Sequence, residues 1–173
     1  MSAENWLQRA SGLWLPRFAN PLGRWGVCPT PCCGFSPTNC EECGNQPVTQ
    51  IWCDIPALTD SYCFSCASYA GTYACTPLST CVYEKQFTAI CGFGLNAVRV
   101  WYEYTGGTCY LWAWLYIIVS TFPNPFYTQT IRWRTTLTEF ADPIDHQLSY
   151  YDTQTTGGNP ACTAVGTTVD VYE

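Results

Sequence analysis

Apolar and polar residues alternate with a period of two along much of the chain after residue 47, the pattern of β-strands. Gly106 and Gly107 join two alternating segments and predict a hairpin. Helix is expected only as a short segment over residues 3–11 and one turn within residues 142–151. The chain is therefore predicted to be all-β, an antiparallel β-sandwich or jelly-roll-like domain. The expected strands are residues 48–57, 71–76, 80–87, 96–104, 108–119, 127–137 and 167–172.

The alternation also predicts which side chains point inward. Val98, Val100 and Tyr102 share one strand face. The segment 108–119 is apolar on both faces, which is typical of a central strand covered on both sides. The alternative is an aromatic row on the surface that stacks on a sugar or docks on a partner protein. This possible ligand platform consists of Tyr110, Trp112, Trp114 and Trp133.

The first 27 residues differ from the rest because they are basic and rich in large apolar side chains. Pro16 and Pro21 exclude one long helix. The segment packs on its own domain, docks on a neighbouring subunit, or lies on a membrane surface. The docking interpretation makes residues 1–27 an N-terminal arm that binds other structural proteins of one assembly, and it favours a homo-oligomer. The residues expected to insert are Trp6, Leu13, Trp14 and Phe18.

Residues 28–47 form a loop rich in Cys, Pro and Gly that has no apolar period and cannot build a core. Cross-links must hold it, and the adjacent Cys32 and Cys33 favour disulfides. The alternative is a zinc site, because the Cys-x-x-Cys-Gly spacing is that of a zinc knuckle. Its ligands would be Cys28, Cys32, Cys40 and Cys43.

The chain has 13 cysteines, an odd number that leaves at least one thiol unpaired or bonded to another chain. Disulfides need an oxidising compartment, yet the first residues do not form a secretory signal. A virion protein, made in the host cytosol and later exposed outside the cell, reconciles the two. The cysteines of the strand-rich region 48–173, expected as disulfide partners, are Cys53, Cys63, Cys66, Cys75, Cys81, Cys91, Cys109 and Cys162.

Charge and composition exclude further classes. The net charge of -6 argues against a nucleic-acid binder, and no apolar stretch is long enough to span a membrane. His146 is the single histidine, and no nucleophile motif accompanies it, so no enzymatic activity is expected. A calcium site at Asp142, Asp145 and Asp152 is a minor alternative to the absence of any cofactor.

A resemblance covers residues 48–173. It is carried by Cys63-Phe64-Ser65-Cys66, Ala70-Gly71-Thr72-Tyr73, Cys81-Val82-Tyr83 and Thr168-Val169-Asp170-Val171. This pattern resembles the uncharacterised Cys-rich β-sandwich modules of planctomycete-type secreted proteins and tailed-phage structural proteins. The resemblance implies a disulfide-stitched β-sandwich and brings no catalytic residues.

Together these features predict a non-enzymatic structural or interaction protein of an extracellular assembly. A phage particle is the favoured setting, with the chain as a decoration, minor capsid, tail or fibre component. The alternative is a carbohydrate-binding or adhesin module that uses surface Trp and Tyr.

Overall fold

The computed structural model describes residues 6–8, 14–16, 18–19, 25–26, 37–43, 49–60, 66–89, 94–119, 127–138, 144–156 and 161–173. The chain divides into two compact units, Met1–Phe35 and Ser36–Glu173. This boundary falls inside the predicted Cys/Pro-rich loop of residues 28–47.

In the first unit the structure describes two short antiparallel pairs. One joins β1 (Trp6–Gln8) to β2 (Trp14–Pro16), and the other joins β3 (Phe18–Ala19) to β4 (Trp25–Gly26). The helix predicted for residues 3–11 is therefore wrong, because the backbone there pairs with a second strand. Leu13 and the side chains of the other three predicted arm residues lie outside the described part of the chain.

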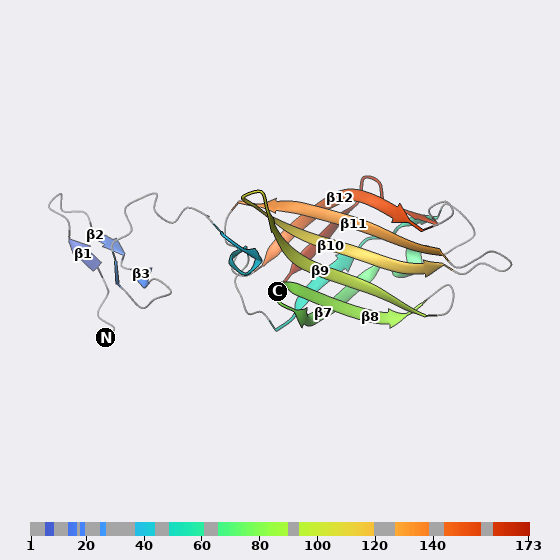
Figure 1. Cartoon of the computed structure of the whole chain (residues 1–173), viewed down its shortest axis with the longest axis horizontal. Helices are drawn as coiled ribbons and strands as arrows, with labels where there is room; N and C mark the ends of the chain where they lie inside the picture. The colour runs from blue at the N-terminus through green and yellow to red at the C-terminus, as the bar shows by residue number, and fades with distance from the viewer. Residues whose placement is uncertain are drawn as a thin grey trace. The chain divides into compact units, whose positions relative to one another are not determined.

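In the described part of the second unit, eight strands close into one antiparallel barrel (Figure 1). Around the barrel they follow the order β10-β11-β12-β14-β5-β7-β8-β9. Their bounds are β5 (Ile51–Ile55), β7 (Gly71–Ser79), β8 (Val82–Thr88), β9 (Leu95–Thr105), β10 (Thr108–Val119), β11 (Tyr127–Leu137), β12 (Asp145–Thr155) and β14 (Thr168–Tyr172).

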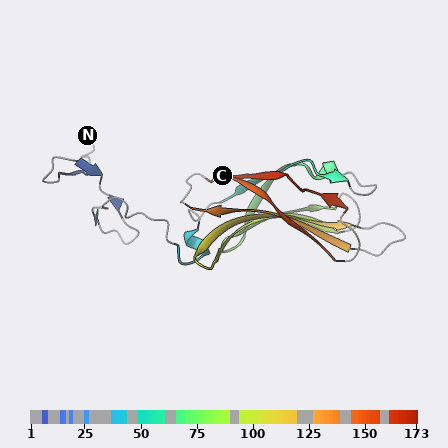
Figure 2. The ribbon, with the colours of Figure 1, turned by 90° about the horizontal axis from the view of Figure 1, so that it is seen from above.

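Closure depends on the last strand. β14 pairs with β12 on one side and with β5 on the other, where Val171 lies opposite Cys53. Viewed from above, the red C-terminal strands lie across the barrel from the green-to-yellow β9 and β10 (Figure 2). The all-β, disulfide-bonded fold is confirmed, but one continuous closed sheet stands where two packed sheets were expected. Closure removes the unpaired strand edges that an open sheet would leave.

The remaining elements are short. The 3-10 helix η1 (Cys40–Glu42) precedes the barrel, and η2 (Cys66–Tyr69) lies between β5 and β7 in the chain. A two-stranded sheet joins β6 (Thr59–Asp60) to β13 (Cys162–Thr163). The helical turn expected within residues 142–151 is wrong, since β12 runs through most of that segment and pairs on both sides.

The core fills the inside of the barrel, as the alternation predicts. Val98, Val100 and Tyr102 are buried on β9, and alternate residues of β10 are buried opposite them. The hairpin predicted at Gly106 and Gly107 is confirmed, with φ of 58° and 81° at the two residues. Positive φ at both central positions is what a type I′ hairpin turn requires, and glycine adopts it without steric cost.

Candidate functional site

The outer surface of the barrel carries a dense group of aromatic and arginine side chains, which we call the aromatic–arginine face. The group arises because the odd-numbered residues of β9 and the even-numbered residues of β10 and β11 point outward, opposite the buried core positions. The face comprises Arg99, Trp101, Tyr110, Trp112, Trp114, Arg132, Arg134 and Tyr151.

One row of this face crosses five strands at directly paired positions. Glu84 pairs with Arg99, Arg99 with Trp114, Trp114 with Arg132, and Arg132 with Asp152. The row therefore reads acid, arginine, tryptophan, arginine, acid from β8 to β12. The Cβ atoms of directly paired residues lie about 5 Å apart. Arg99 contacts both Glu84 and Trp114, whereas Arg132 contacts Asp152 and lies over the rings of Trp112 and Tyr151.

Both ends of the row are ion pairs. The Arg99 Nε donates to Glu84 Oε2 at 2.7 Å, and the Glu84 side chain is only 7% exposed. At the other end Arg132 makes a forked pair with Asp152, from Nε to Oδ1 and from Nη2 to Oδ2. These hydrogen bonds raise the pKa of Arg132. The forked pair fixes the plane of the Arg132 guanidinium, because two parallel charge-assisted bonds define an orientation.

The arginines also lie over aromatic rings. Arg99 lies 4.6 Å from the Trp114 ring centroid, and Arg134 lies 4.1 Å from that of Tyr151. Trp101 and Trp112 stack in parallel beside them. The indole nitrogens of Trp112 and Trp114 are buried and have no hydrogen-bond partner among the described residues. Each cation–π contact contributes about 0.5–2 kcal/mol, so several of them together hold the side chains of the face in fixed positions.

A hollow of about 260 Å³ interrupts the face beside Trp114. Its floor is Ala97, which lies between Gln86 on β8 and Tyr116 on β10 at directly paired positions. The Ala97 side chain is only a methyl group, whereas the next two outward positions of β9 carry the large side chains of Arg99 and Trp101. The difference in size leaves the space. A second hollow of about 150 Å³ shares Arg99 and Trp114 with the first. The Arg99–Trp114 pair is therefore a ridge between two depressions.

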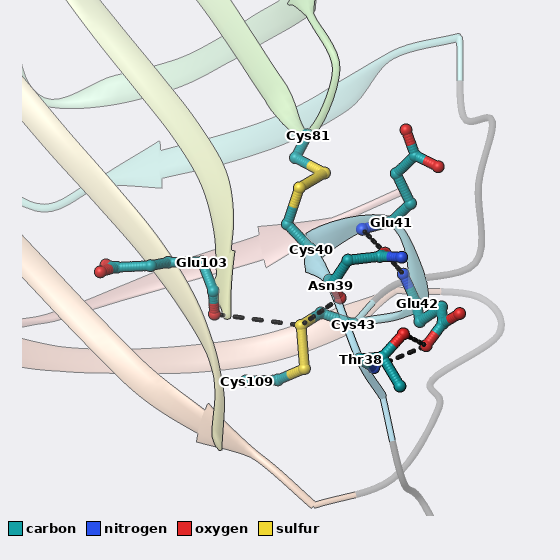
Figure 3. Close-up of a disulfide and its surroundings, with 9 residues drawn as sticks. All are labelled: Thr38, Asn39, Cys40, Glu41, Glu42, Cys43, Cys81, Glu103 and Cys109. Atoms are coloured by element: carbon teal, nitrogen blue, oxygen red, sulfur yellow. Dashed lines mark hydrogen bonds between the residues drawn. A yellow bond between two sulfur atoms is a disulfide. The ribbon is translucent and has the colours of Figure 1, made fainter. Parts of the chain in front are cut away.

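The loop of residues 37–43 is fastened to one end of the barrel (Figure 3). Cys40 bonds to Cys81 in the turn between β7 and β8, and Cys43 bonds to Cys109 at the start of β10. Asn39 caps η1, because its Oδ1 accepts from the backbone nitrogens of Glu41 and Glu42 at 2.9 and 3.1 Å. The loop has no core of its own, as predicted, and covalent bonds hold it.

The metal alternatives do not fit these positions. Cys40 and Cys43 are used in disulfides, so their assignment as zinc ligands is wrong, and Cys28 and Cys32 lie outside the described residues. The calcium site is also wrong for Asp145 and Asp152, which are seven positions and therefore about 23 Å apart along β12. Asp152 is paired with Arg132, and Asp142 is not among the described residues.

A third disulfide in the described part of the chain joins Cys66 of η2 to Cys162 of β13. Beside it, the buried Gln129 accepts from the backbone nitrogens of Ala161 and Cys162 at 2.9 and 3.1 Å and donates to the Cys162 carbonyl. The structural bridge predicted from the Cys63–Cys66 turn is thus confirmed for Cys66. Cys28, Cys32, Cys33, Cys63 and Cys91 lie outside the described residues.

Cys53 and Cys75 form no disulfide, so their assignment as disulfide partners is wrong. They lie inside the barrel on the adjacent strands β5 and β7. Burial raises the pKa of Cys53 well above its usual value. Burial and then the charge of Glu84 raise the pKa of Cys75 to about 12. Both groups are therefore protonated thiols at neutral pH, which disfavours a role as nucleophile or redox centre.

Three of the four residues of the predicted ligand platform lie together on one face, and their binding of a ligand stays a prediction. Tyr110, Trp112 and Trp114 lie on the outer face, but Trp112 is only 7% exposed. Trp133 is fully buried inside the barrel, where its Nε1 donates to Thr167 Oγ1 at 3.0 Å, so its placement in the platform is wrong. The sequence reasoning missed Glu84, Gln86, Ala97 and Arg99, although their outward alternation on residues 80–87 and 96–104 was a usable signal.

Comparisons with protein-family models, curated proteins and solved structures gave no match. The resemblance of residues 48–173 to Cys-rich modules therefore stays a prediction. Within the described ranges, no helix is long and apolar enough to cross a membrane.

Proposed function

We propose that this protein is a non-enzymatic structural or interaction protein of an extracellular assembly. The observation that carries the proposal is the aromatic–arginine face, where Arg132 and Arg134 are pre-oriented beside half-buried rings. Arginine and aromatic side chains are enriched at protein interfaces, and holding them rigid lowers the entropy lost on binding. A closed barrel supplies that rigidity.

An oxidising setting is supported by the three described disulfides, which join Cys40 to Cys81, Cys43 to Cys109, and Cys66 to Cys162. Bridges of this kind persist outside the reducing cytosol. Among extracellular assemblies we favour a phage particle, where the chain serves as a decoration, minor capsid, tail or fibre component.

A non-enzymatic role is supported by the state of the potential nucleophiles. The thiols of Cys53 and Cys75 face the core and have raised pKa values, and neither lines the hollow on the outer face. His146 lies on β12 in the same cross-strand row as Cys53, but Val171 of β14 stands between them.

In this proposal residues 1–27 dock on a neighbouring subunit. The support is the load of large apolar side chains in a segment that belongs to a separate compact unit. A homo-oligomer in which the arm of one copy binds the next is the arrangement we favour.

The direct test is to purify particles from the cells that make the protein and to look for the chain by mass spectrometry under non-reducing conditions. The proposal expects the full chain in the particles and its loss from them when residues 1–27 are deleted. Circular dichroism of the truncated chain must still report the β-barrel. Absence of the full chain from every extracellular particle fraction would contradict the assembly role, and normal incorporation of the truncated chain would contradict the docking arm.

A further inference from the structure

The hollow above Ala97 is slightly smaller than a typical small-molecule site. Its volume of about 260 Å³ lies just below the range of drug-sized ligand pockets, which begins near 300 Å³. A ligand of one ring therefore fits, and a longer one would have to extend outward over the rim. The rim includes Leu95, a large apolar side chain that is 54% exposed.

The walls offer hydrogen-bond donors and acceptors together. Gln86 Nε2 donates to Glu84 Oε1 at 2.8 Å, which leaves the Gln86 carbonyl oxygen as an acceptor. Arg99 directs its Nε and Nη2 to a single oxygen of Glu84, so other N–H groups of the guanidinium have no partner among the described residues. The exposed Gln86 amide and the Arg99 guanidinium, whose side chain is 33% exposed, both line the hollow.

An aromatic wall completes the hollow. Trp114 and Tyr116 lie on the same face of β10 with ring centroids 6.2 Å apart and planes inclined by 35°. The Trp114 indole nitrogen is a buried donor without a partner among the described residues. Aromatic rings provide an electron-rich surface for C–H groups, while the polar neighbours provide directional bonds.

The charge of the hollow selects among ligand classes. Arg99 and Glu84 neutralise each other at 2.5 Å, so neither an anion nor a cation finds an uncompensated partner there. An anionic ligand would face the Glu84 carboxylate, and a cationic one would face the guanidinium. A neutral ring with several hydroxyl groups and one apolar face matches the polar walls, the aromatic wall and the balanced charge of the hollow.

We propose that the hollow formed by Gln86, Ala97, Arg99 and Trp114 binds a neutral pyranose ring, as a free sugar or as the terminal unit of a glycan. The ring lies over the Ala97 methyl with its C–H face on the Trp114 and Tyr116 wall. Its hydroxyl groups donate to the Gln86 carbonyl oxygen and accept from Arg99. This site goes beyond the assembly role and does not rest on it.

The test is a titration of the ¹⁵N-labelled full chain with single neutral sugars, namely glucose, galactose, mannose and N-acetylglucosamine. The indole N–H signals report the position of binding. With at least one sugar the Trp114 signal shifts and saturates, and the Trp133 signal inside the barrel does not move. An affinity near 1 mM corresponds to about 4 kcal/mol, which is reasonable for one ring in an open hollow.

Two variants and a matched control localise the site. Ala97→Leu fills the floor, and Gln86→Ala removes the acceptor without adding bulk; each is expected to raise Kd at least about tenfold. Gln147→Ala changes an exposed glutamine on β12 that bonds to Asp170, and it leaves Kd unchanged. Should Ala97→Leu fail to fold, Gln86→Ala still decides the matter.

Further arms separate the ligand classes. Equal binding of a sugar and its methyl glycoside identifies a glycan terminus, and binding of the reducing sugar alone identifies a free sugar. Four outcomes would overturn the proposal. The first is that the Trp114 signal does not shift at about 100 mM of any neutral sugar, a concentration well above a millimolar Kd. The second is binding of charged sugars only, such as glucuronate or glucosamine. The third is a shift confined to other tryptophans, and the fourth is an unchanged affinity in the folded variants.

Discussion

Trp101 on β9 and Trp112 on β10 occupy directly paired positions, and their rings stack with centroids 5.5 Å apart and planes inclined by 2°. The contact lies on the outside of the barrel, where strands often carry only polar side chains. Trp112 is nonetheless 7% exposed, because Tyr151 and Arg134 cover its other sides. The outer surface of β9–β12 therefore forms a second packed layer.

Replacing Trp112 with alanine should reduce the free energy of unfolding by about 3 kcal/mol, since large aromatic truncations at buried sites cost about 3–5 kcal/mol and this one lies in the outer layer rather than in the core. Urea denaturation followed by circular dichroism measures the change. The control is Leu78→Ala, at a side chain that is 57% exposed, which should stay within about 0.5 kcal/mol of the unaltered chain. Equal stability of the two variants would mean that the second layer contributes nothing to folding.

Gln129 should be the polar residue of the barrel interior that tolerates replacement least. In Gln129→Leu the backbone nitrogens of Ala161 and Cys162 lose their acceptor, and each buried unpaired group costs about 1–3 kcal/mol. We expect a loss of about 3 kcal/mol in the free energy of unfolding, with faster amide exchange at residues 161–163. The matched control is Gln147→Leu on the exposed side of β12. A loss of less than about 1 kcal/mol would show that water replaces the amide.

Removal of the Cys66–Cys162 bridge by Cys66→Ala with Cys162→Ala should cost about 3–5 kcal/mol. The bridge closes a loop with a sequence separation of 96 residues, and the entropy that a cross-link removes from the unfolded chain grows with loop length. The paired variants Cys40→Ala and Cys81→Ala, whose separation is 41, should cost less. Thermal and urea unfolding of both double variants provide the comparison, and the reverse order would contradict this account.

Stability should fall as the pH rises above about 9. The pKa of Cys75 is raised from 9.0 to about 12 in the folded protein, so between these values the unfolded chain loses a proton that the folded chain keeps. The free energy of unfolding therefore falls as the pH rises through this range. The stabilisation that the Cys75 thiol provides is fully present below about pH 9. Urea denaturation at pH 7, 9 and 10.5 measures the slope. In Cys75→Ala the slope should become smaller, and an unchanged slope would assign the effect to other groups.

The alternation of side chains predicted the inner faces of β9 and β10 correctly, because the sequence of one strand shows which of its residues share a face without any knowledge of its neighbours. It did not predict closure. An inward apolar face is common to a sandwich and a barrel, and closure depends on the pairing of Val171 with Cys53, 118 positions apart in the chain. The short β6 and β13 were missed because two-residue strands carry no periodic signal.

The residues of the predicted ligand platform show an error that came from residue type alone. Trp133 was grouped with Trp112 and Trp114 because of its ring, but the register between β10 and β11 sets it opposite Ala113 and turns it inward. The same register places Arg132 and Arg134 outward, beside the tryptophans. Neither strand contains this information alone. The helix expected near Asp145 failed for a related reason, since pairing with β11 and β14 outweighs a weak local preference.

The two disulfides of the loop at residues 37–43 determine which strands carry a mechanical force applied to the N-terminal side of the chain. A pull on the chain before Thr38 reaches Cys81 and Cys109 through covalent bonds, at the β7–β8 turn and the start of β10. It bypasses β5, which would otherwise be the first strand loaded and could peel away from β14 one hydrogen bond at a time. The load is instead divided between two hairpins at one end of the barrel. Tension applied from the chain before Thr38 is therefore expected to load these two hairpins before β5.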